Sequence, residues 1–248
     1  MERKYLLKPD SPDLRDYFYR SHTFKTLTDL PRAVDLRSKM SPIVDQGQLG
    51  SCTANAIVSG LREYLEIDAE QELVRLSRLF LYYEERKLEG TINEDSGASL
   101  RDGMKVLSQI GVCPEEDYPY DISKFTEAPT SLAIDHAAQY KINEYHRITD
   151  LQGLKVALSE GLPVVFGFQV YQSFESEQVA KTGKVPMPKK DEQLLGGHAV
   201  LAVGYMDRGK SGSLIVRNSW GNEWGDQGYC YMSYRVFNKL VMDMWTGH

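Results

Sequence analysis

Apolar residues recur every three or four positions in the first half of the chain, but alternate or form short runs in the second half. The clearest repeat follows Cys52, where polar residues separate the apolar positions Ala54, Ile57, Val58, Leu61 and Leu65. A repeat near 3.6 residues puts such side chains on one face of a helix. The pattern therefore predicts an amphipathic helix from Cys52 to about Glu66, with one buried face.

Two more helices are expected in the first half of the chain. Serines that can cap a helix open the apolar repeats over 77–88 and 99–110, and Gly111 is suited to end the second of them. Three prolines then punctuate residues 111–130. This stretch is expected to be a surface connection.

Beyond residue 130 the pattern becomes typical of strands. After a short helix over 151–161, apolar and alternating stretches predict four strands, over residues 163–170, 198–205, 212–218 and 228–234. Residues 172–197 contain Gly183, two prolines and several lysines, which indicates a long exposed loop. Helices followed by strands favour an α+β architecture with two lobes.

The first 30 residues show no regular period. They carry prolines and many charges, together with the aromatic run Tyr17, Phe18 and Tyr19. We interpret this segment as an extended arm that docks on the body through its aromatic side chains. The alternative is a loose terminal tail. An extended segment over 34–37 then leads toward a glycine-rich turn.

Size and charge narrow the class of protein. The 248 residues suffice for one large domain or two small ones, and the net charge of −6 argues against nucleic-acid binding as the main role. The sequence contains no run of about 18 apolar residues that could span a membrane. Its first residues lack the apolar core of a secretory signal. We expect a monomer that is cytoplasmic or is exported without a conventional signal peptide.

The three cysteines are too few for a disulfide framework, which favours a reducing compartment. Cys113 and Cys230 are interpreted as buried, inert thiols. The cysteines and histidines lack the spacing of a zinc site, and the glycines form no phosphate loop. The sequence thus predicts neither a metal site nor a cofactor.

Cys52 stands where the glycine-rich turn enters the first predicted helix. Unpaired N–H groups in the first turn of a helix favour negative charge, so they are expected to lower the thiol pKa and make Cys52 a usable nucleophile. Gln46 lies six residues upstream and can offer its side-chain amide to an oxyanion. The alternative is that Cys52 is a small buried apolar residue.

A base and an orienting group are available farther along the chain. His198 follows two glycines at the start of one predicted strand, and Asn218 closes another. If both meet Cys52, its thiolate can attack a carbonyl carbon, while His198 holds the thiolate as an ion pair and later protonates the leaving amine. Asn218 would accept a hydrogen bond from the imidazole, and Gln46 with the Cys52 N–H would hold the oxyanion.

Three motifs occur in order along the chain. They read Gln-Gly-x-x-Gly-Ser-Cys from Gln46, His-Ala-Val-x-x-x-Gly-Tyr from His198, and Asn-Ser-Trp-Gly-x-x-Trp-Gly-x-x-Gly-Tyr from Asn218. They resemble the three signatures of the papain-like cysteine peptidases, and the likeness covers about residues 31–235. The resemblance implies a papain-like two-lobe fold, with a helical lobe and an antiparallel β-barrel lobe on either side of the active cleft.

The same resemblance assigns parts of the chain to the lobes. It implies a helical lobe over 31–130 with the nucleophile and a β-barrel lobe over 131–248 with the histidine and asparagine. The short segment 1–30 looks like the leader of bacterial and viral members of the family. We hypothesise that this leader lies over or into the cleft and restrains activity.

Further roles are implied residue by residue. Trp220 would shield the hydrogen bond between Asn218 and His198 from water, and Gly97 would line the cleft and bind the substrate backbone. Gly197, beside the histidine, offers no side chain to tune the pH profile. Thr53 departs from the family pattern, because a tryptophan usually follows the nucleophile.

The implied activity is that of a cysteine peptidase acting on peptide or protein substrates. We expect an endopeptidase that forms a thioester on Cys52 and has a preference set by an apolar pocket. Two alternatives remain open. The same residues could deamidate or transfer an acyl group to an amine, or the chain could be a catalytically silent peptide-binding module.

Overall fold

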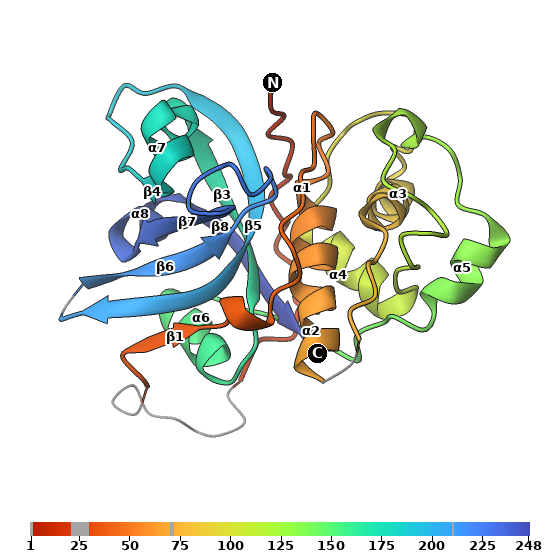
Figure 1. The fold of residues 1–248 in the computed structure, drawn as a ribbon, viewed down its shortest axis with the longest axis horizontal. Coiled ribbons are helices and arrows are strands. Elements are labelled where there is room, and N and C mark those ends of the chain that lie inside the picture. Colours follow the sequence, from red (N-terminus) through yellow and green to blue (C-terminus); the bar gives the residue numbers. More distant parts are fainter. Residues whose placement is uncertain (1, 21–29, 70–71, 210) are drawn as a thin grey trace.

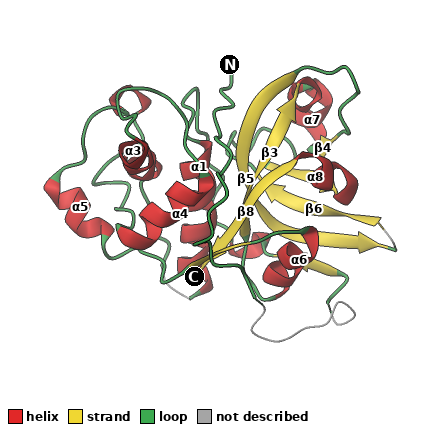
Figure 2. Ribbon diagram, turned by 180° about the vertical axis from the view of Figure 1, so that it is seen from behind, coloured by secondary structure: helices red, strands yellow, loops and turns green. Residues whose placement is uncertain are grey.

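The computed structural model describes residues 2–20, 30–69, 72–209 and 211–248. Helices gather on one side of the molecule and a twisted sheet on the other, with the N-terminal segment running between them (Figure 1). The view from behind shows the same two lobes (Figure 2). The expected two-lobe α+β architecture is therefore confirmed.

The helix that begins at the nucleophile candidate is continuous but changes its winding. It consists of α1 (Cys52–Ala54), the π-type segment η3 (Asn55–Arg62) and α2 (Glu63–Asp68). Every residue of η3 is buried, so the expectation of a single buried face is wrong. The reason is that the strand lobe packs on the opposite side, where a Cβ at Gly60 would lie 3.0 Å from the Leu201 side chain.

Other helices complete the helical side of the molecule. Their bounds are α3 (Arg78–Glu89), α4 (Leu100–Gln109), η4 (Ile122–Lys124) and α5 (Ser131–Ala137). Ser77 accepts a hydrogen bond from the third residue of α3 and Ser99 from the third of α4, which confirms both caps. The sequence analysis missed α5, which lies among the helices in Figure 1 although it follows residue 130.

The strand lobe is built on one sheet. Its strands are β1 (Ala33–Asp35), β2 (Tyr145–Arg147), β3 (Val164–Tyr171), β4 (Lys184–Val185), β5 (Leu194–Arg208), β6 (Ser211–Arg217), β7 (Tyr229–Ser233) and β8 (Val241–Gly247). The order is β2-β8-β3-β5-β6-β7-β4, with β1 on β5. Only the β4–β7 pair is parallel among these pairings. The long strand β5 is therefore central and is held by both β3 and β6.

Short helices pack on the sheet. They are α6 (Leu151–Ser159), η5 (Gln172–Glu175), α7 (Glu177–Thr182) and α8 (Tyr234–Leu240). The expectation of a long exposed loop over 172–197 is thus wrong, because Phe174 and Val179 are buried in the core of the strand lobe. Ser176 caps α7 and Gly183 ends it in the left-handed region, two signals that the sequence did contain.

The N-terminal segment docks on the body only partly as expected. Tyr17 and Phe18 are 78% and 56% exposed and do not anchor it, whereas Tyr19 packs against the core of the strand lobe. Leu7 is buried as well, and residues 2–10 pass between the lobes toward the far side of the molecule. Residues 1 and 21–29 of the predicted arm lie outside the described residues.

Candidate active site

Cys52 opens α1 and is completely buried. Ala199, on β5 of the opposite lobe, is buried in the same core cluster as Cys52, and its backbone N–H acts to lower the pKa of the thiol. Burial nonetheless raises the thiol pKa to about 12, and this outweighs the N–H groups of Ala199, Thr53 and Cys52 itself. The lowered pKa expected from the helix N-terminus is therefore absent in this state, because water does not reach the sulfur.

His198 directly precedes Ala199 on β5. Its register is fixed by β3, where Phe168 is its partner in the ladder. The ring Nε2 lies 2.8 Å from Asn218 Oδ1, while Nδ1 is buried without a hydrogen-bond partner among the described residues. Burial lowers the imidazole pKa to about 4, although the bond to Asn218 acts in the opposite direction.

Asn218 is held within the strand lobe, whereas Gln46 is held across the junction of the lobes. Asn218 directly follows β6, and its Oδ1 also accepts a hydrogen bond of 2.9 Å from the Ser219 N–H. The Gln46 Oε1 accepts from the Ser219 hydroxyl at 2.7 Å, and the Gln46 N–H donates to the Ser219 carbonyl at 2.9 Å. Gln46 Nε2 donates to the Leu49 carbonyl at 3.1 Å. These bonds fix the amide beside the turn that carries Cys52.

Aromatic rings cover the histidine and its partner. Trp220 is 6% exposed, and its ring centroid lies 5.1 Å from that of His198 at an angle of 30°. Tyr5 of the N-terminal segment meets both rings edge-on, with centroid distances of 6.1 Å. The Arg3 guanidinium carbon lies 5.1 Å from the Trp220 centroid. The N-terminal segment thus takes part in excluding water from the imidazole.

The backbone of the segment pairs with both walls of the cleft. The Leu7 N–H donates to the Gly197 carbonyl at 3.2 Å, and the Lys8 N–H donates to the Ala98 carbonyl at 3.1 Å. The segment thereby forms two parallel β-bridges, Leu6 with Gly197 and Lys8 with Ser99. Gly97 has φ of +66°, and a Cβ there would collide with the carbonyl oxygen of Leu6. Glycine is therefore needed at position 97 for an extended chain to lie this close.

Charged side chains fasten the segment to the helical lobe. Ion pairs join Arg3 to Asp45 at 2.7 Å and Lys4 to Asp95 at 2.6 Å. A third pair joins Lys8 to Glu89. The sequence analysis missed these contacts, because charge alone does not identify partners more than 40 positions away.

Farther along, Asp16 forms a buried charge cluster with the body of the protein. It accepts from Arg101 and from Arg147 at 2.7 and 2.8 Å, and Arg147 also pairs with Asp243 at 2.8 Å. Asp16 is 6% exposed at its side chain. The two arginines hold the Asp16 pKa below its usual value although burial acts to raise it.

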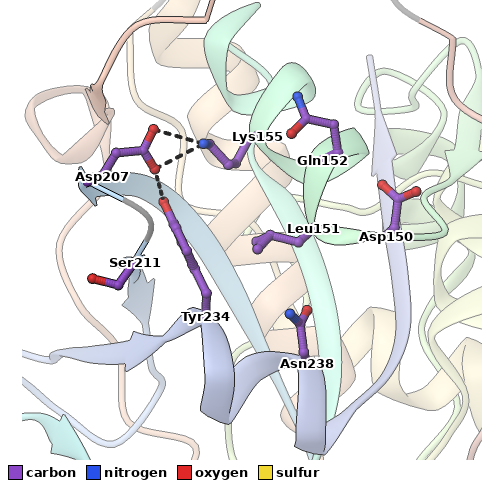
Figure 3. Close-up of a pocket in the computed structure, with 9 residues that line it drawn as sticks. Asp150, Leu151, Gln152, Lys155, Asp207, Ser211, Tyr234 and Asn238 are labelled. Carbon is purple, nitrogen blue, oxygen red and sulfur yellow. Dashed lines mark hydrogen bonds and ion pairs between the residues drawn. The ribbon is translucent and has the colours of Figure 1, made fainter. Parts of the chain in front are cut away.

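The hollow drawn in Figure 3 lies elsewhere, beside α6 and the end of β5. Its Lys155 ammonium lies 2.9 Å from both carboxylate oxygens of Asp207, and the Tyr234 hydroxyl donates to the same carboxylate at 2.6 Å. None of the four predicted catalytic residues lines it. Within the described parts of the chain, no cluster of potential metal ligands and no helix able to cross a membrane was found.

The fold therefore brings Gln46, Cys52, His198 and Asn218 to one junction between a helix N-terminus and a sheet. Gly97, Gly197 and Trp220 lie around the same junction, in contact with the N-terminal segment. This combination of lobes and side chains defines a class of enzymes that attack carbonyl carbons with a thiol.

The family follows from comparison with known proteins. A family model described as papain family cysteine protease matches residues 30–244, and the chain belongs to this family. It is 44% identical over 229 residues to an uncharacterized peptidase C1-like protein of Acanthamoeba polyphaga mimivirus, covering 88% of this chain and 72% of that one. It is 30% identical to cysteine proteinase 3 of Entamoeba histolytica, covering 80% of this chain and 61% of that one.

Solved structures agree. Xylellain, a cysteine protease from Xylella fastidiosa, is 39% identical, has a TM-score of 0.88 and matches 100% of this chain and 97% of that one. Digestive procathepsin L 3 from Tenebrio molitor has a TM-score of 0.73 at 21% identity, covering 94% and 74% of the two chains. This second likeness supports the fold alone. The protein is a papain-like cysteine peptidase, as the motifs predicted.

Proposed function

We propose that the protein hydrolyses internal peptide bonds through a thioester on Cys52. The observation that carries the proposal is the hydrogen bond between His198 and Asn218, which stands beside Ala199 on β5, a residue buried in the same core cluster as Cys52. The thiolate attacks the carbonyl carbon, and protonated His198 gives its proton to the leaving amine. Water, deprotonated by His198, then cleaves the thioester and releases the acid.

Asn218 and Gln46 have supporting roles in this proposal. Asn218 accepts from the imidazole and keeps the ring oriented through both proton transfers. The Gln46 amide and the Cys52 N–H stabilise the oxyanion, each donor being worth roughly 3 kcal/mol of barrier. The hydrogen bonds that hold Gln46 against Ser219 support this role, because they preorganise its amide.

We infer that substrates bind as extended chains between Gly97 and Gly197. Support comes from the N-terminal segment, which pairs with exactly these two walls through backbone hydrogen bonds, at Ala98 and at Gly197. Its Leu7 side chain lies against Gly197 and Gly167, which favours an aliphatic residue at the corresponding position of a substrate. Trp220 shields the imidazole from water while the substrate is bound.

We also propose that residues 1–30 are an inhibitory leader. The segment covers His198 with Tyr5, whose hydroxyl donates to Glu175 of the strand lobe, and it is fastened to the helical lobe by ion pairs. A chain that starts at Pro31 should cleave peptides faster than the full chain. Equal rates would remove the inhibitory role, and added leader peptide should slow the shortened chain again.

The experiment for the main proposal is cleavage of a peptide library by the full chain and by its Cys52→Ala variant. Mass spectrometry should find pairs of fragments whose summed mass exceeds that of the intact peptide by one water, and none with the variant. Mass changes of deamidation or of transfer to an added amine would favour the acyl-transfer alternative. Binding without any product would favour a silent peptide-binding module.

We further propose a monomer without nucleic-acid partners. The acidic net charge of −6 supports the second point. The three buried free cysteines suit a reducing compartment such as the cytoplasm. We retain the division into residues 1–30, 31–130 and 131–248 as the proposed domain organisation.

A further inference from the structure

Thr53, the residue next to the proposed nucleophile, is hydrogen-bonded to the buried acid Glu85. Its hydroxyl donates a 2.7 Å hydrogen bond to Glu85 Oε2, and both residues are completely buried. Glu85 lies on α3, so this bond links the first turn of the nucleophile helix to the next helix of the lobe. Nothing in the catalytic scheme above uses either group.

The surroundings of Glu85 supply no direct counter-charge. Its Oε1 lies over Gly103 of α4, where any Cβ would collide with it, and it has no hydrogen-bond partner among the described residues. The neighbouring Arg86 donates instead to the carbonyls of Tyr82, Ile92, Glu94 and Phe125. A carboxyl in such a place is desolvated without an ion-pair partner.

The titratable groups that face Glu85 are mostly acidic. Burial raises the Glu85 pKa well above its usual value, and Glu89 on α3 and Asp102 on α4 act in the same direction. The Thr53 bond and Arg86 act against the rise but do not cancel it. On the side of α1, a charge on Glu85 would in turn raise the pKa of the Cys52 thiol.

We propose that Glu85 is a positioning residue for Cys52: its uncharged carboxyl fixes Thr53, and with it the nucleophile turn, without placing a negative charge near the thiolate. The inference rests on the proposed role of Cys52 as nucleophile. Only a group that accepts a hydrogen bond while remaining neutral meets both demands. A carboxylate would oppose formation of the thiolate, and an apolar side chain would leave the Thr53 hydroxyl unpartnered.

Two pairs of substitutions in the full chain test this. Glu85→Leu removes the acceptor, whereas Glu85→Gln keeps a neutral acceptor of the same shape. Thr53→Val removes the donor, whereas Thr53→Ser keeps it. Glu84→Gln is the matched control, because Glu84 is a neighbouring buried acid of α3 whose partner is Lys87, at 3.3 Å.

The readouts are kcat and KM on a peptide substrate and the rate of Cys52 alkylation by iodoacetamide across pH. We expect the Leu and Val variants to lose roughly five- to tenfold in kcat and in alkylation rate at neutral pH, with KM nearly unchanged, as for one lost hydrogen bond. The Gln and Ser variants should restore most of that loss. All variants keep the leader, so its shielding of Cys52 affects each variant and the wild type alike and cancels when their rates are compared.

Two outcomes would overturn the proposal. Leu and Val variants that react like the wild type would show that the bond does not position Cys52. A Gln variant as impaired as the Leu variant would show that an ionised carboxylate is needed. The alkylation measurement requires no substrate, so it decides the role of Glu85 even if the peptidase proposal fails. If Glu85→Leu does not fold, the two Thr53 variants give the answer.

Discussion

At the scale of single residues, burial decides the protonation of the reactive pair. The thiol pKa of Cys52 is raised to about 12 and the imidazole pKa of His198 is lowered to about 4, so both groups are neutral near pH 7. A thiolate–imidazolium pair needs the two pKa values to move in the opposite directions. Burial in the covered state therefore disfavours the thiolate–imidazolium pair, and we expect access of water or substrate to the sulfur to favour it.

The bond from His198 Nε2 to Asn218 is the contact most open to a direct test. Asn218→Ala removes the acceptor that orients the imidazole, and we expect kcat to fall by roughly 10- to 100-fold with little change in KM, part of what positioned proton transfer contributes. Steady-state kinetics on a cleaved peptide measures this. Asn222→Ala, an exposed position of the same turn, should leave kcat unchanged. A fall smaller than twofold for Asn218→Ala would contradict the role.

At the scale of elements, the N-terminal leader behaves as an additional edge in the cleft. Its strand-like pairing supplies only a few backbone hydrogen bonds, so its buried apolar residue is expected to contribute much of its hold. Leu7 is 6% exposed, whereas Leu14 of the same segment is fully exposed. Substituting each leucine in turn therefore distinguishes the loss of a docked side chain from the mere loss of a leucine in the leader.

Leu7→Ala should loosen the leader. Loss of a buried leucine side chain costs about 2 to 5 kcal/mol, so the open population should rise at least tenfold. The measurement is the alkylation rate of Cys52 in the full chain, because the reagent reaches the sulfur only when the leader has left. Leu14→Ala is the control and should react at the wild-type rate. A Leu7→Ala rate equal to that control would mean that the leader is not the barrier.

Elements differ in how far the sequence predicts them. The caps at Ser77 and Ser99 and the apolar stripe after Cys52 are local signals, and the corresponding helices begin where predicted. The short elements α7 and β4 are not predicted, because their burial depends on distant partners such as the sheet. The ion pairs of the leader cannot be predicted from the sequence for the same reason, because their partners are distant along the chain.

The site shows the same division. Motifs predict Cys52, His198 and Asn218 as catalytic residues, because their chemistry restricts residue type and spacing. The neutral state of Cys52 and His198 was not predictable, because it depends on which segment covers them in the fold. Likewise Thr53 was noticed as a departure from the family pattern, but its partner Glu85, 32 positions away, carries no local signal.

At the scale of the whole molecule, proton binding is linked to the position of the leader. In the covered state, burial and the nearby Arg3 guanidinium lower the His198 pKa from its ordinary value of 6.5 to about 4, although the bond to Asn218 acts in the opposite direction. Departure of the leader removes Arg3 and Tyr5 from this surrounding, so the open state is expected to bind more protons than the covered one. We therefore expect acidification through this range to favour opening and neutral pH to favour the covered form.

Hydrogen exchange can follow this linkage. Protection factors of the Leu7 and Lys8 amides, which include the correction for intrinsic exchange, should fall as the pH is lowered from about 7 to about 5. The reason is that protonated His198 is disfavoured under the leader. His198→Gln should show a smaller fall, since the linked proton is absent. Protection that is constant over this range in the wild type would contradict the linkage.

Hydrogen bonds between the two lobes converge on residues 217–219. Gln46 is joined to Ser219, and the buried Arg217 guanidinium donates to the carbonyls of Ser41 and Pro42 at 2.5 and 3.0 Å. The residues that orient the proposed catalytic groups are thus direct neighbours in sequence of the residues that hold the two lobes together. Neither half can be exchanged for that of a relative on its own: a working hybrid has to inherit both sides of these joints together.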